Sequence, residues 1–79
     1  MQLHKTEDME YNVFELLFKA ELKRLKLRKK DVAKHLNLTM PTLKGRVEDP
    51  NTFKIQEVKL MRELGFDIET MYNIILFRI

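Results

Sequence analysis

Apolar residues recur at intervals of three and four residues in the first third of the chain. Between residues 12 and 26 this stripe consists of Phe14, Leu17, Phe18, Leu22 and Leu25. The spacing places all of them on one face of an α-helix. Asn12 followed by Glu15 is typical of a capping box and predicts the start of this helix, although Thr6 would also serve as the cap of an earlier start.

Three further helices are predicted over about 29–36, 40–48 and 53–64, because apolar residues keep the helical spacing there. Thr39 is suited to cap the helix at 40–48, and Pro41 falls in its first turn, where a missing N–H costs little. The residues expected to face inward are Val32, Ala33, Leu36, Leu43, Val47, Ile55, Val58, Met61 and Leu64.

The C-terminal segment is compatible with two structures. Gly65 is suited to end the preceding helix, and Asp67 to cap a short helix that contains Met71 and Tyr72. The sequence NIILFRI, residues 73–79, is instead rich in β-branched and aromatic residues, which favour a strand. We therefore expect an all-α fold, a small bundle of four to five helices in which the tail is a helix or a short strand.

A single domain is expected over residues 1–79, with its core at 12–72 and an apolar tail at 73–79. The tail carries more apolar side chains than one small core can cover, and exposed apolar patches usually mark a partner site. We therefore expect a homodimer. The alternative is that the tail closes the core of the monomer by packing on Phe14 and Phe18. The apolar residues concerned are Ile74, Ile75, Leu76, Phe77 and Ile79.

Composition argues against several functional classes. The chain has no Cys and no Ser, so it lacks thiolate metal ligands and the two commonest nucleophiles. His4 and His35 stand alone, and no glycine-rich phosphate loop is present. We therefore expect neither an enzyme nor a metal or other cofactor. The chain also lacks the run of about 20 apolar residues that a membrane span needs, and its first ten residues are too polar for a signal peptide. A cytoplasmic protein is expected.

Charge is unevenly distributed along the chain, although the net charge is only +3. Residues 7–15 contain four acidic residues and no basic one, whereas residues 23–34 contain seven basic residues against the single acid Asp31. This segregation predicts one positively charged face, which suits a polyanionic partner. A solvated helix face that binds nothing is the alternative.

The basic stretch is broken at Asn37-Leu38-Thr39, between two predicted helices. Asn tolerates the left-handed conformation that a sharp turn needs, and Thr39 caps the helix that follows. Ala33 is small where two crossing helices must approach closely. This arrangement, in KKDVAKHLNLTMPTLKGRVED (residues 29–49), resembles the helix-turn-helix of the lambda-repressor-like family, which includes Cro and XRE-like domains.

The resemblance extends over about residues 12–72, since VKLMRELGFDIETM (58–71) is similar to the next two helices of the family. The family usually has a Ser or Thr cap followed by Gln at the start of its first motif helix, where this chain has Arg28 and Lys29. Asn37 replaces a turn glycine, and Gly45 lies inside the helix that would read DNA.

The resemblance implies a sequence-specific DNA-binding transcriptional regulator, a repressor of phage or mobile-element type, whose recognition helix at about 40–48 enters the major groove of double-stranded DNA. Arg46 is a candidate for DNA contact but would equally pair with Glu48 or Asp49. The rival interpretation is a helical protein-interaction module, an adaptor or antirepressor that keeps the fold without binding DNA. The implied DNA-binding residues are Lys29, Lys30, Lys34, Thr39, Met40, Pro41, Thr42, Lys44, Gly45, Arg46, Asn51 and Lys54.

Overall fold

The computed structural model describes residues 5–76, with side chains over residues 13–73. This part of the chain is all-helical, as expected, and no strand occurs within it. Its elements are α1 (Lys5–Leu25), α2 (Lys29–Leu36), α3 (Met40–Glu48), the short 3₁₀ helix η2 (Pro50–Thr52), α4 (Ile55–Leu64) and α5 (Ile68–Leu76).

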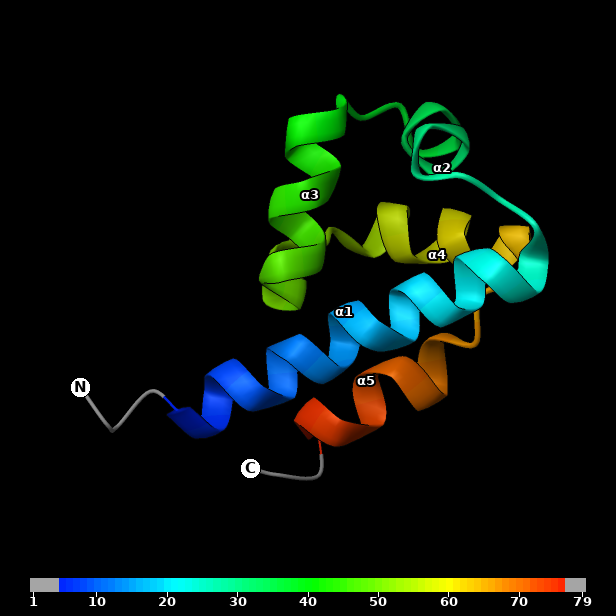
Figure 1. Ribbon diagram of the computed structural model, residues 1–79. Helices are drawn as coiled ribbons and strands as arrows, with labels where there is room; N and C mark the ends of the chain where they lie inside the picture. Colours follow the sequence, from blue (N-terminus) through cyan, green and yellow to red (C-terminus); the bar gives the residue numbers. More distant parts are fainter. Residues whose placement is uncertain (1–4, 77–79) are drawn as a thin grey trace.

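The long helix α1 forms the centre of the bundle. It packs against α3 on one side and against α5 on another, while α2 packs against α3 and α4 (Figure 1). Its apolar stripe supplies the largest side chains of the core, because Phe14 and Phe18 are almost completely buried. The other core residues are Leu22, Val32, Ala33, Leu36, Leu43, Val47, Met61, Phe66, Ile68 and Met71.

Two aromatic contacts fix the position of α5 and the turn before it. The ring of Phe18 stacks on that of Phe66, with centroids 5.4 Å apart, and the rings of Phe14 and Tyr72 meet edge to face, with centroids 5.0 Å apart. Such pairs contribute roughly 0.5–1.5 kcal/mol beyond the area that they bury. The chain up to Tyr72 therefore closes the monomer's own core. The apolar side chains after residue 73, on which the predicted dimer depends, lie outside the described residues.

The predicted bounds of α2 and α3 are confirmed, and so is the turn between them. Asn37 adopts the left-handed conformation, with φ 60°, and the N–H of Leu38 donates to the carbonyl of Ala33 at 2.8 Å. Ala33 is buried and Leu38 packs against the core. Gly65 ends α4 with φ 108°, as predicted.

Two predicted helix starts are wrong. α1 begins at Lys5 and not near residue 12, so both Asn12 and Thr6 lie inside the helix and neither is its cap. α4 begins at Ile55, whose side chain is 72% exposed instead of facing inward. The reason is that Phe53, just before the helix, takes the inward position and meets Phe14 at 6.2 Å between ring centroids.

The strand alternative for the C-terminal segment is wrong for residues 73–76, because α5 continues to Leu76. Asp67 caps it as predicted, with its carboxylate accepting from the N–H and the hydroxyl of Thr70. Once the helix has started, the contacts of α5 with α1 outweigh the β propensity of the isoleucines. Residues 77–79 lie outside the described residues.

Candidate nucleic-acid interface

The start of α2 is stabilised by a carboxylate three residues into the helix. Arg28 occupies the cap position, and its N–H donates to Oδ2 of Asp31 at 2.8 Å. This backbone N–H, followed by the Arg28 side chain, holds the pKa of Asp31 below its usual value. The usual Ser or Thr cap is therefore not needed here, and α2 begins at the first of its lysines.

Basic side chains are exposed along α2. Lys29 and Lys30 extend from its first turn and Lys34 from its last. All three remain accessible to a partner that approaches from solvent. The structure thus keeps the predicted phosphate-contacting lysines on one short helix.

The first turn of α3 is held by two threonines. The N–H of Thr42 donates to Oγ1 of Thr39 at 3.2 Å, and the Thr39 hydroxyl donates to Oγ1 of Thr42 at 2.9 Å. Thr39 is thereby confirmed as the N-cap of α3. Contact of either hydroxyl with a base edge stays a prediction, and Thr42 retains a hydroxyl hydrogen for it.

α3 has one inward and one outward face, as predicted. Leu43 and Val47 are buried against the core, whereas Met40 is 45% exposed and Lys44 has a side chain that is 75% exposed. The Lys44 ammonium group lies 4.0 Å from Glu48, one turn along the helix. An ion pair this exposed contributes little to stability, so Lys44 is available to a ligand.

Arg46 lies in a different environment from the one predicted. Its guanidinium donates to both carboxylate oxygens of Glu57 on α4, at 2.9 and 3.2 Å, and pairs with neither Glu48 nor Asp49. Glu57 also accepts from the N–H of Lys54 at 2.9 Å. Burial would raise the pKa of Glu57, but the Arg46 guanidinium and this N–H outweigh it and hold that pKa below its usual value.

The Arg46–Glu57 pair should make stability depend on acid pH. A carboxyl with a lowered pKa stabilises the fold fully above its unfolded-state pKa of 4.5, and this contribution is lost as the pH falls through the lower folded-state value. At pH 7 we expect Glu57→Gln to lower the free energy of unfolding by roughly 1.5–3 kcal/mol. Chemical denaturation at pH 7 and pH 3 measures this. The difference in free energy of unfolding between Glu57→Gln and the wild type should be smaller at pH 3 than at pH 7. An equal difference at the two pH values would show that the charge of Glu57 contributes nothing to stability.

Gly45 lies on the exposed side of α3 in ordinary helical conformation. A Cβ at this position would meet nothing within 4 Å. Glycine therefore has no packing role in the free protein. It either only weakens the helix or lets the backbone approach DNA closely, and the second role stays a prediction.

Gly45→Ala should stabilise the protein by about 0.5–1 kcal/mol, because alanine restricts the unfolded chain and fits the helix. We expect a melting temperature a few degrees higher by circular dichroism. If glycine is needed for close backbone approach to DNA, the same variant will bind DNA more weakly despite its higher stability. Unchanged DNA affinity would leave Gly45 without a role in binding.

The loop after α3 is anchored to the core. The hydroxyl of Tyr72 donates to the carbonyl of Pro50 at 2.9 Å, and burial raises the pKa of Tyr72. Asn51 and Lys54 are exposed on either side of Phe53. Both belong to the predicted backbone contacts, and they follow the C-terminal end of α3 in the chain.

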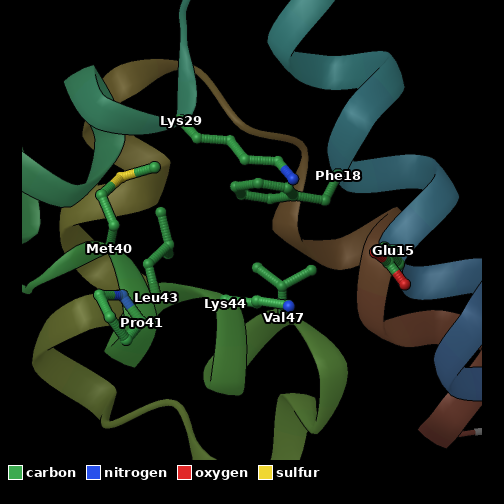
Figure 2. A pocket seen from close by; sticks show the side chains of 8 residues that line it. All are labelled: Glu15, Phe18, Lys29, Met40, Pro41, Leu43, Lys44 and Val47. Atoms are coloured by element: carbon green, nitrogen blue, oxygen red, sulfur yellow. The ribbon is translucent and has the colours of Figure 1, made fainter.

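A cavity of about 400 Å³, which the sequence did not predict, lies between α1, the start of α2 and α3 (Figure 2). Lys29 and Lys44 reach toward it from opposite sides. The periodicity assigned Phe18, Leu43 and Val47 to the core but gave no signal that the core opens here. The lining residues are Glu15, Phe18, Lys29, Met40, Pro41, Leu43, Lys44 and Val47.

Four predicted DNA-binding residues are thereby brought together around one opening: Lys29, Met40, Pro41 and Lys44.

The chain matches no protein-family model, and comparisons with curated proteins and with solved structures give no significant match. Within residues 5–76 no helix is both long and apolar enough to span a membrane. The described side chains also include no cluster of three His, Asp or Glu that would hold a metal ion.

Proposed function

We propose that the protein is a sequence-specific DNA-binding transcriptional regulator, a repressor of the phage repressor and Cro type that acts in the cytoplasm. The observation that carries the proposal is the pair α2–α3 with its sharp turn at Asn37. The pair exposes Lys29 and Lys44 on one surface, while Leu43 anchors α3 in the core.

The roles proposed within this surface differ. The lysines at the start of α2 contact phosphates, which gives affinity and register but no sequence choice. Lys44 projects from the middle of α3, where it reaches acceptors on guanine in the major groove. Met40 and Pro41 present apolar surface that suits a thymine methyl group. Arg46 takes a structural role instead, since the carboxylate of Glu57 accepts from both its Nε and its Nη2.

We further propose that the regulator acts as a homodimer. A single recognition helix reads few base pairs, whereas two helices one DNA turn apart read a palindrome. Sedimentation velocity of the full chain and of a chain ending at Tyr72 tests this. A full-length monomer at tens of micromolar rules the dimer out, and a truncated chain that merely unfolds favours a tail that completes the monomer.

The DNA-reading assignment predicts different behaviour for two lysine variants. Lys44→Ala should cost roughly 1–3 kcal/mol at the preferred site and relax base preference there. Lys29→Ala should weaken binding to all sequences alike, because a phosphate contact is blind to sequence. Selection of bound oligonucleotides, followed by titration of both variants on the selected and a scrambled duplex, measures this. Reversed behaviour of the two variants contradicts the assignment.

The second candidate is a protein-interaction module that keeps this fold without binding DNA. The apolar cavity beside α3 favours it, because a surface that only contacts DNA needs no such opening. A folded protein that binds no duplex at low salt would support this candidate over the regulator.

A further inference from the structure

The cavity between α1, α2 and α3 has the size and lining of a small-molecule site. Its volume of about 400 Å³ falls within the usual range for such sites, about 300–1,000 Å³. Phe18, Leu43 and Val47, all buried side chains, form an apolar floor. Met40 and Pro41 extend the apolar surface toward solvent.

Two cations border this apolar floor. Lys29 enters from the first turn of α2 and Lys44 from α3, on opposite sides of the opening (Figure 2). Among the described residues Lys29 has no ion-pair partner, and Lys44 has only the exposed contact with Glu48 at 4.0 Å. Both ammonium groups are therefore free to accept an anionic group.

The single acid of the lining, Glu15, does not cancel this charge. It belongs to α1, and its carboxylate lies 3.7 Å from the ammonium group of Lys19. Figure 2 shows its carboxylate to the right, apart from the nitrogen atoms of both lysines. The opening between α2 and α3 thus remains positive above an apolar floor.

We propose that this cavity binds a small amphipathic monocarboxylate, a compound with one carboxylate on an apolar body. The carboxylate lies between the ammonium groups of Lys29 and Lys44, and the apolar body fills the space over Phe18, Leu43 and Val47. An apolar body is required by the floor and an anion by the two lysines, so neither a phosphate alone nor a neutral hydrocarbon satisfies both.

A bound carboxylate would also antagonise DNA binding, a consequence that rests on the proposed function. Lys29 and Lys44 belong both to the cavity and to the proposed DNA surface, and Met40 and Pro41 would be covered by the apolar body. Ligand and DNA then exclude each other, so the affinity of the protein for DNA falls in proportion to ligand occupancy.

Calorimetric titration with octanoate tests the site directly, with octan-1-ol and octylamine as probes of equal chain length. We expect octanoate to bind at a single site, octan-1-ol several-fold more weakly and octylamine not at all. Lys29→Gln and Lys44→Gln should each weaken octanoate binding by about threefold, as for a partly exposed charge pair. Lys59→Gln, an exposed change on α4 away from the cavity, should leave it unchanged.

Lack of octanoate binding by the folded wild type overturns the proposal, and so does equal binding of the three probes. The proposal is also overturned if neither Lys29→Gln nor Lys44→Gln weakens octanoate binding.

Titration of DNA with and without saturating octanoate tests the antagonism. Octanoate binding without any DNA binding would support the site while refuting the proposed function, and equal DNA affinity with and without octanoate would refute the antagonism alone.

Discussion

Phe18→Ala will lower the free energy of unfolding by about 3–5 kcal/mol, the usual cost of truncating a buried aromatic side chain. Phe18 is completely buried, stacks on Phe66 at 5.4 Å and also forms part of the cavity floor. Phe18 lies on the helix that packs against both α3 and α5, so its truncation affects the centre of the bundle. A domain has a total stability of about 5–15 kcal/mol, so this loss is a large part of the total and should lower the melting temperature markedly.

Leu16→Ala provides a matched control on the same helix. Leu16 is two residues from Phe18 but is 64% exposed, so its truncation should change stability by no more than about 0.5 kcal/mol. Chemical denaturation followed by circular dichroism measures both variants. Similar losses for the two would contradict the packing of α1, because the buried and exposed faces of the helix would then be misassigned.

Joint replacement of Lys29 and Lys30 by glutamine should weaken DNA binding by roughly tenfold to a hundredfold near 0.1 M salt. Each lysine that neutralises a phosphate adds about 0.9 to the steepness of the salt dependence, so the loss of two should reduce it by about 1.8. The physical reason is that fewer counterions are released from the duplex. Fluorescence anisotropy of a labelled duplex at several salt concentrations measures both quantities.

Lys59→Gln with Arg62→Gln removes the same charge from α4, outside the proposed surface, and serves as the control. Its affinity should fall much less, because the lysines at the start of α2 are proposed to touch the duplex while these two are not. Equal losses in the two double variants would mean that the net charge of the protein attracts DNA without a defined surface.

The sequence predicts α2 and α3 well because their ends are decided locally. Asn37 needs only its own backbone to adopt φ 60°, and Thr39 caps through an N–H three residues away. The left-handed stop at Gly65 and the cap at Asp67 are equally local. These signals, together with the apolar spacing, are sufficient for the all-α fold and for the separation of α3 into two faces.

The features that the sequence does not predict depend on contacts between distant elements. Arg46 finds Glu57 on the next helix and not the nearer Glu48, because Glu57 is buried and already fixed by the N–H of Lys54. Ile55 is exposed because Phe53 takes the inward position beside Phe14. The cavity likewise follows from the placement of α1 against α3, which residue spacing does not encode.

The salt dependence of DNA binding by the wild-type protein tests the central claim most directly. A labelled mixed-sequence duplex is titrated at a series of salt concentrations, with circular dichroism confirming that the protein stays folded at each. The account predicts that the logarithm of the affinity falls linearly with the logarithm of the salt concentration, with a slope of several multiples of about −0.9. A folded protein that binds no duplex at low salt, or one whose affinity does not change with salt, would contradict it.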